Sequence, residues 1–284
     1  MAPPPLAFRI ARALIRRGLP GGWRLLAALE RAGALNRTAT HDLGGGVSLE
    51  APLWRSVNRW DLPDLLAYDP PLIDDLAAAA SALPRPLVFV DCGADIGAVT
   101  ALLAARVRLD RIVAFEPNPE AFPFLRDNLA RLPAAASHRA AVADFAGGGE
   151  LRSPPHDATD HAKYVAPAEP GDFPVLTIDG LGLAPGGGLL LKVDVEGAEL
   201  AVLRGAEASL RAAAGFAVSF EAQRDQAARV GIEPMDIVAF LETIRPCEVT
   251  VSDLPGFRPE RGRPFFAQIP NAKGFGYNLM CRSL

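Results

Sequence analysis

Cysteine and long apolar runs are scarce in this chain of 284 residues, and each shortage excludes a class of protein. The three cysteines are an odd number without a Cys-x-x-Cys pair, which argues against a disulfide framework or zinc site and favours a reducing compartment. No apolar run approaches the ~18 residues that span a bilayer. A formal net charge of −4 offers no general attraction for nucleic acid. We therefore expect a cytoplasmic protein that does not bind nucleic acid.

A pyrophosphate-binding turn of the form Gly-x-Gly-x-x-Gly is also missing from the region where it would be expected. Residues 91–97 (Asp-Cys-Gly-Ala-Asp-Ile-Gly) instead follow an apolar run at 87–90 and precede a helix-like run at 98–107. A strand, a glycine-containing turn and a helix in this order bind adenosine cofactors at the carboxyl edge of a parallel sheet. Glu116 closes the next apolar strand, 112–115, where its two carboxylate oxygens can accept hydrogen bonds from both ribose hydroxyls.

The acidic residue that opens this turn indicates which nucleoside is bound. A carboxylate at Asp91 would repel a pyrophosphate, whereas it would attract the ammonium group of a methionine moiety, directly or through water. Gly93 and Gly97 allow the backbone to bend and to approach a ligand closely. The turn therefore favours S-adenosylmethionine over a dinucleotide, although an ordinary tight turn between a strand and a helix would show the same glycines.

Two later segments add polar residues to the same predicted edge. The run Ala141–Val142–Ala143 is a third strand candidate and ends at Asp144, which can meet an adenine amino group. The run 189–193 is a fourth strand candidate that continues into Asp194 and Glu196. Because ligands of open α/β sheets bind at the carboxyl ends of the strands, these acids are candidates for the site.

With these motifs in place, the chain resembles the FkbM family of S-adenosylmethionine-dependent methyltransferases. The resemblance runs from about residue 87 to about residue 221, nearly half of the chain, and its most specific part is Lys-Val-Asp-Val-Glu-Gly-Ala-Glu at 192–199. Asp95 is a departure, because the family usually has Asn there. The matching segments are 90–97, 114–119, 125–129, 191–199 and 202–206, followed by the strand that ends at Glu221.

The resemblance implies that S-adenosylmethionine is the cofactor and that the acceptor is a hydroxyl group on a small molecule or saccharide. The residues that we expect to bind the cofactor are Asp91, Gly93, Ala94, Asp95, Gly97, Glu116, Pro117, Asn118, Asp144 and Asp194.

Methyl transfer to an alcohol also needs a base within hydrogen-bonding reach of the acceptor. Asp194 and Glu196 leave the fourth strand beside the expected methyl position, and either can be that base or can orient the hydroxyl. In the structural alternative, Asp194 caps the following helix and Glu196 pairs with Lys192 or an arginine. Glu196 and Glu221 are the candidates for binding substrate hydroxyls, although Glu221 can equally pair with Arg224.

His161 is the third candidate base, because histidine transfers protons near neutral pH. Together with His156, Asp157 and Asp160 it could also form a metal site, but a surface loop explains the same composition. We therefore assign no metal ligands from the sequence.

The order of apolar and amphipathic segments predicts an α/β fold, with the Rossmann-like, mostly parallel sheet of class I methyltransferases and an antiparallel C-terminal strand. We expect an N-terminal helical extension and lead-in at 1–83 and the cofactor-binding domain at 84–284. The expected strands are 87–91, 111–116, 138–142, 189–194, 216–221, 248–252 and 277–281, and the expected helices include 70–83, 97–107, 119–132 and 233–243. Residues 144–172 are expected to form an irregular loop or a small hairpin.

The N-terminal 40 residues are basic, with seven arginines against the single acid Glu30. Their charge of +6 leaves −10 for the rest of the chain. Leu6, Ile10, Ala13 and Leu14 share one helical face, so residues 6–17 can rest weakly on an anionic membrane surface and make the protein peripheral. Alternatively, this segment packs as a helical extension with a solvated basic face.

The leading functional hypothesis is O-methylation of a sugar, glycan or secondary metabolite. One alternative is a binding module that keeps the fold but is catalytically silent. A less favoured alternative is a nicotinamide-dependent oxidoreductase, which the missing pyrophosphate turn opposes.

Overall fold

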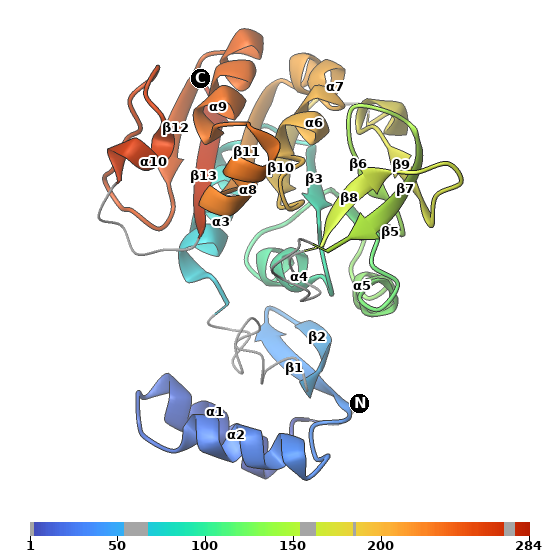
Figure 1. The fold of residues 1–284 in the computed structure, drawn as a ribbon, viewed down its shortest axis with the longest axis vertical. Coiled ribbons are helices and arrows are strands. Elements are labelled where there is room, and N and C mark those ends of the chain that lie inside the picture. The colour runs from blue at the N-terminus through green and yellow to red at the C-terminus, as the bar shows by residue number, and fades with distance from the viewer. Residues whose placement is uncertain (1–2, 54–67, 154–162, 184–185, 270–275) are drawn as a thin grey trace.

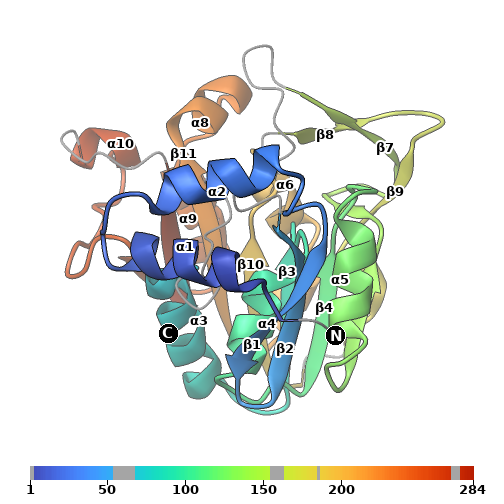
Figure 2. The ribbon, with the colours of Figure 1, turned by 90° about the horizontal axis from the view of Figure 1, so that it is seen from below.

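The computed structural model describes residues 3–53, 68–153, 163–183, 186–269 and 276–284. At the N-terminal end, α1 (Leu6–Arg16) and α2 (Gly22–Arg31) lie side by side (Figures 1 and 2). Gly22 permits this close packing, because a Cβ at this position would lie 2.7 Å from Cγ1 of Ile15. The helices lead into an antiparallel hairpin of β1 (Thr38–Gly44) and β2 (Val47–Pro52).

Seven strands of the described chain form the main sheet, in the order β12-β13-β11-β10-β3-β4-β5. All neighbouring pairs are parallel except those made by β13, which runs antiparallel to β11 and β12. The predicted fold class and the antiparallel C-terminal strand are therefore confirmed. The bounds are β3 (Leu87–Cys92), β4 (Arg111–Phe115), β5 (Ala135–His138), β10 (Gly188–Val193), β11 (Gly215–Gln223), β12 (Cys247–Val251) and β13 (Gly276–Ser283).

Helices cover both faces of this sheet, which explains why its central strands are nearly continuous apolar runs. On one face the core is closed by α3 (Pro70–Ala82), α4 (Ala98–Ala104) and α5 (Phe122–Leu129). On the other face it is closed by α6 (Glu199–Arg204), α7 (Glu207–Ala212) and α9 (Pro234–Ile244). Two short helices, α8 (Arg224–Val230) and α10 (Phe265–Gln268), complete the C-terminal half. Among the described residues, no helix is long and apolar enough to cross a membrane.

The division of the chain at residue 83 stays a prediction, and the packing of α3 bears on it. Leu72, Ile73 and Leu76 of this helix are buried in the same core as Phe89 of β3. The first two helices instead enclose a small core of their own, around Phe8 and other side chains. By packing, α3 therefore lies with the main sheet.

A second, smaller sheet stands beside β5, in the order β6-β9-β7-β8 (Figure 1). Its strands are β6 (Ala141–Val142), β7 (Gly147–Arg152), β8 (Tyr164–Pro167) and β9 (Phe173–Leu176). The β7–β8 pair is the hairpin that was one of two expectations for residues 144–172. The short 3₁₀ helix η4 (Asp179–Leu181) follows β9.

The predicted third strand at 138–142 is wrong. Residues 135–138 pair with β4 in the main sheet, whereas 141–142 turn away and pair with β9 in the smaller sheet. Both segments are short, with four and two residues in their strands, and pairing partners distant in sequence decide which of them continues the sheet. The predicted helix at 119–132 also begins later, at Phe122, because the Asn118 side chain first accepts the backbone N–H of Glu120 in a tight turn.

Candidate functional site

The site lies where the order of the main sheet reverses. From β3 the chain proceeds outward to β4 and β5, and it returns to β10 on the other side of β3 before continuing to β11. Adjacent strands whose connections diverge leave a crevice at their carboxyl ends, where open α/β sheets bind ligands. We call the turn 93–97 with Glu116 the cofactor side, and Asp194, Glu196 and Glu221 the acceptor side.

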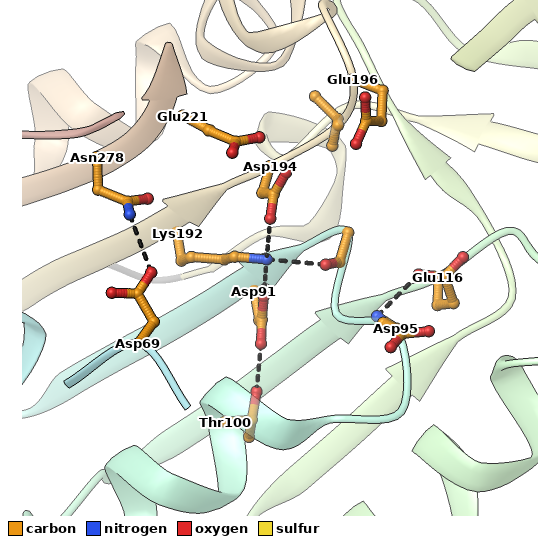
Figure 3. A network of polar contacts seen from close by, with 12 residues as sticks. Asp69, Asp91, Asp95, Thr100, Glu116, Lys192, Asp194, Glu196, Glu221 and Asn278 are labelled. Atoms are coloured by element: carbon orange, nitrogen blue, oxygen red, sulfur yellow. Dashed lines mark hydrogen bonds and ion pairs between the residues drawn. The ribbon is translucent and has the colours of Figure 1, made fainter. Parts of the chain in front are cut away.

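On the cofactor side, backbone amides hold the Glu116 carboxylate in place. The N–H of Asp95 donates to Oε2 at 2.8 Å (Figure 3), and the N–H of Asn118 donates to Oε1 at 2.8 Å. Each carboxylate oxygen keeps a further lone pair, so both can still accept a hydroxyl hydrogen. The turn itself is tied to β4, since Gly93 and Ala94 donate to the carbonyl oxygen of Phe115 at 3.1 and 2.9 Å.

Burial raises the pKa of Glu116 to about 7, and the negative charge of Asp95 acts in the same direction. Asp95 has a φ of +51°, in the left-handed region. Asp and Asn are the side chains that tolerate this conformation best after glycine. The departure from the Asn usual in the FkbM family is therefore compatible with the backbone of the turn.

Gly93 is required by a close approach within the protein. A Cβ at this position would lie 1.8 Å from the carbonyl oxygen of Asp194, so the two sides of the site pass each other at backbone contact. Gly97, with a φ of +86°, would place a Cβ 3.1 Å from the side chains of Leu125 and Leu129 on α5. Both glycines thus serve the packing of the turn, and their close approach to a ligand stays a prediction.

Lys192 joins the two sides of the site from beneath. Its Nζ donates to the carbonyl oxygen of Gly93 at 2.8 Å and lies 3.3 Å from Oδ2 of Asp194 and 3.5 Å from Oδ1 of Asp91 (Figure 3). Burial alone would lower the pKa of Lys192, but the charges of Asp194 and Asp91 outweigh burial and raise it. The ammonium group therefore stays protonated in the interior.

Asp91 has no exposed surface in this arrangement. Its Oδ2 accepts a hydrogen bond of 2.6 Å from the hydroxyl of Thr100, and its Oδ1 faces Lys192. Because this carboxylate has no surface that a ligand could touch, we propose that Asp91 acts on the cofactor through Lys192 and the turn. It would not contact the ammonium group of the cofactor directly.

On the acceptor side, three carboxyl groups from two neighbouring strands converge. Asp194 and Glu196 follow β10 and Glu221 lies near the end of β11, with one oxygen of each within 4.8 Å of the others (Figure 3). This spacing could also hold a divalent metal ion, since such ions bind several carboxylate oxygens at once. The sequence predicts Glu196 and Glu221 as substrate-binding residues, but it does not reveal how closely the three acids approach, because Glu221 is distant from the other two along the chain.

The pKa of Glu196 is raised to about 8, first by burial and then by the charges of Asp194 and Glu199. The pKa of Glu221 is also raised, by burial and then by Asp194 and Glu196. Side-chain amides hold both groups, because Gln226 donates to Glu196 and Gln223 to Glu221, each at 2.7 Å.

The structural alternatives for these acids were a helix cap for Asp194 and an ion pair with Lys192 or an arginine for Glu196, and the observed contacts bear on them. No side chain caps α6, and Asp194 contacts Lys192 instead. Glu199 accepts the backbone N–H groups of Val195 and Gly197, so it orders the turn that carries Glu196. Glu196 itself adopts a left-handed φ of +59°, which is uncommon for a residue with a side chain.

Two polar residues next to the acceptor side are missed by the sequence reasoning. Asp69 caps α3 by accepting the N–H of Leu72, and its other oxygen accepts a 3.0 Å hydrogen bond from Asn278 of β13 (Figure 3). Burial raises the pKa of Asp69. The Asp-Pro-Pro sequence at 69–71 signals a helix start, but nothing in it reveals a partner at the opposite end of the chain.

Asn128 is a third residue that the sequence reasoning assigned no role. This buried amide donates to the carbonyl oxygen of Ile96 in the cofactor turn at 2.9 Å and exchanges hydrogen bonds with the backbone of Glu50 on β2. The Asn128 side chain therefore links the β1–β2 hairpin to the cofactor turn.

The remaining predicted residues are less closely grouped. Pro117 lies between Glu116 and Asn118 in the turn after β4. Asp144 is exposed, and its Cα lies 3.2 Å from where a Cβ of Gly205 would stand, at the end of α6 farther from Asp194. Its contact with adenine stays a prediction. His161, with His156, Asp157 and Asp160, lies outside the described residues.

The chemistry of the site fits S-adenosylmethionine. The ligand carries a sulfonium and an ammonium group, and the crevice is acidic, with several carboxyl groups against the single buried cation Lys192 among the described residues there. Glu116 keeps free lone pairs for two ribose hydroxyls. Glu116 would hold the ribose, and Asp194 lies beside the turn that would hold the methionine moiety.

Comparisons with known proteins assign the chain to a family. Residues 91–248, more than half of the chain, match a family described as the methyltransferase FkbM domain. No curated protein matches the chain significantly. Among solved structures, similarity extends to a precorrin-6y C5,15-methyltransferase of Geobacter metallireducens, with 14% identity, coverage of 75% of this chain and 88% of that chain, and a TM-score of 0.37.

Two further structures are similar at the same level. An rRNA methylase of Streptococcus thermophilus has 15% identity, 75% and 94% coverage and a TM-score of 0.39. The N-methyltransferase NodS of Bradyrhizobium japonicum has 14% identity, 75% and 92% coverage and a TM-score of 0.40. These likenesses are distant, and the assignment of the chain to a family depends on the match at residues 91–248.

Proposed function

The chain belongs to the FkbM family of methyltransferases and uses S-adenosylmethionine, and we propose that it methylates a hydroxyl oxygen on a sugar, glycan or secondary metabolite. When bound, the cofactor supplies an activated methyl group that is transferred by in-line displacement. The protein then has to position the acceptor, exclude water and receive one proton.

The observation that carries this proposal is the convergence of Asp194, Glu196 and Glu221 beside the cofactor turn. A hydroxyl group both donates and accepts hydrogen bonds, so it matches a cluster that mixes ionised and protonated carboxyl groups. An amine acceptor would be held by the same cluster as ammonium, which has no lone pair to attack with. The acidic surroundings therefore favour oxygen over nitrogen as the methylated atom.

We assign separate roles to the three acids. Glu196 receives the acceptor proton, because its raised pKa makes its ionised form a stronger base. Asp194, held beside Lys192, orients the acceptor hydroxyl. Glu221 binds a further hydroxyl of the acceptor. The left-handed backbone at Glu196, worth about 1–3 kcal/mol of strain, supports a functional role, because such strain concentrates at active sites.

The test is transfer of an isotope-labelled methyl group from S-adenosylmethionine to matched acceptor pairs. Each pair consists of a hydroxylated saccharide or polyol and its amino analogue, and the methylated atom is identified by mass spectrometry. We expect an ether product from the hydroxyl member of at least one pair. An N-methyl product, or cofactor binding without transfer to any acceptor, would contradict the proposal.

Asp194→Asn separates catalysis from folding in the same assay. This variant should bind S-adenosylmethionine within about threefold of the parent but lose about 100-fold in turnover, because the acceptor hydroxyl is no longer held in the reactive orientation. Asp225→Asn is the matched control, because this exposed acid on α8 lies next to Gln226 but outside the cluster. Loss of the folded state in Asp194→Asn would instead favour a structural role for Asp194.

A further inference from the structure

The two N-terminal helices α1 and α2 and the turn between them form what we call the N-terminal helical hairpin. Its outer face exposes an unusual number of large apolar side chains. Among the described residues, five large apolar side chains are exposed, and three of them lie on this hairpin: Leu6 at 70%, Ile10 at 48% and Leu19 at 48%. Such exposed patches, when they are contiguous, mark interaction sites more often than isolated exposed residues do.

These side chains are not needed to hold the hairpin together. Phe8 and Ala11 of α1 are fully buried and pack with Leu26 of α2 in the small N-terminal core. Leu6 and Ile10 are one helical turn apart on the opposite side of α1, where they face away from this core. Helix α1 therefore has two apolar faces, and only the face with Phe8 and Ala11 packs against the rest of the protein.

Arginine surrounds the unused face. Arg9, Arg16 and Arg17 are exposed beside Leu6 and Ile10, and α2 adds the exposed Arg24. The 40 residues around them carry +6, whereas the remainder of the chain carries −10. The positive charge is therefore concentrated on α1, α2 and their connections, which lie at one end of the molecule (Figure 1), whereas the rest of the chain is acidic.

We propose that this face, formed by Leu6, Arg9, Ile10, Arg16, Arg17 and Leu19, docks onto an anionic lipid bilayer surface. Aliphatic side chains on a helix enter the boundary of the acyl region, while adjacent guanidinium groups bind lipid phosphates. Each basic residue near such a surface adds to the attraction, which salt screens. Nucleic acid would bind the arginines through its phosphates, but it would not bury the exposed Leu6 and Ile10.

The test is co-sedimentation of the full chain with vesicles of phosphatidylcholine alone or mixed with phosphatidylglycerol. We expect binding to the mixed vesicles only, and loss of this binding at high salt. The double variants Leu6→Gln/Ile10→Gln and Arg9→Gln/Arg17→Gln should each weaken binding by about tenfold. Leu284→Gln is the matched control, because this leucine is equally exposed but lies at the other terminus.

Several results would overturn the proposal. One is failure of the full chain to bind anionic vesicles at low salt, and another is unchanged binding after Leu6→Gln/Ile10→Gln. Retention of single-stranded RNA that depends on the arginines but not on Leu6 and Ile10 would point to nucleic acid instead. A dimer in sedimentation velocity that Ile10→Gln dissociates would show that a second copy covers the face. Since the substituted side chains are exposed, circular dichroism should show that every variant stays folded.

Discussion

The cofactor side and the acceptor side meet at the same sheet edge but are built differently. Glu116 is held by backbone N–H groups of Asp95 and Asn118, so its position follows from the path of two turns. Glu196 and Glu221 are held by the side chains of Gln226 and Gln223. A site for a fixed cofactor can depend on backbone geometry, whereas a site for a particular acceptor depends on side chains that substitution can change without altering the fold.

The two sides also differ in how they manage negative charge. The pKa of Glu116 is raised to about 7 although two backbone amides favour its ionised form. On the acceptor side, like charges stand close together and the pKa of Glu196 is raised to about 8. Lys192 is the buried cation that contacts both sides. The difference between the two sides can therefore be tested first by substitution of Lys192, which contacts both, and then by substitutions on each side separately.

The largest effect is expected from Lys192→Met. This change leaves Asp91 as an uncompensated buried charge, which should lower the free energy of unfolding by about 3–5 kcal/mol. Urea denaturation followed by circular dichroism measures the loss. The double variant Lys192→Met/Asp91→Asn should recover part of it, and the control Arg111→Met, which changes an exposed cation on β4, should stay within ~0.5 kcal/mol. An unchanged urea midpoint for Lys192→Met would show that the buried pair is not required.

The next effect is expected from Glu196→Gln, which acts on the acceptor side alone. A base must be ionised, so kcat/KM of the parent should rise with pH through about 8 and level off above it. The variant should lose this rise and about 1,000-fold in kcat, while its affinity for S-adenosylmethionine is retained. A pH profile unchanged by Glu196→Gln would remove this residue as the base.

The smallest effect is expected from Glu116→Ala, which acts on the cofactor side alone. Loss of hydrogen bonds to a charged acceptor should raise the Kd of S-adenosylmethionine by about 10- to 100-fold. Calorimetric titration with S-adenosylmethionine and S-adenosylhomocysteine measures this change. The control Glu120→Ala alters an exposed acid in the following turn and should leave the Kd unchanged. If Glu116→Ala bound the cofactor as tightly as the parent, ribose recognition by Glu116 would be ruled out.

The sequence predicts most of the fold, because its elements have strong local signals. Buried apolar runs such as 87–92 and 188–193 have the length and composition of central parallel strands, and glycines mark the turns that come after them. The error at 138–142 occurs where two short neighbouring segments, 135–138 and 141–142, pair in different sheets. Local composition cannot decide between them, because partners distant in sequence supply the pairing energy.

The cofactor side is likewise readable from the chain, since an acid after one strand and a glycine turn after its neighbour must meet at one edge of a parallel sheet. The contacts of a second group of residues cannot be read from the chain in this way: Lys192, Glu221, Asp69, Asn128 and Asn278. Apart from local contacts such as those of Lys192 with Asp194 and of Glu221 with Gln223, their partners lie from 25 to 209 residues away, and only packing brings them together. The sequence by itself determined the fold class, the family and the cofactor, because these depend on local order and spacing. The tertiary structure alone decided the carboxyl cluster, its raised pKa values and the buried lysine beneath it, because proximity and burial are properties of the folded chain.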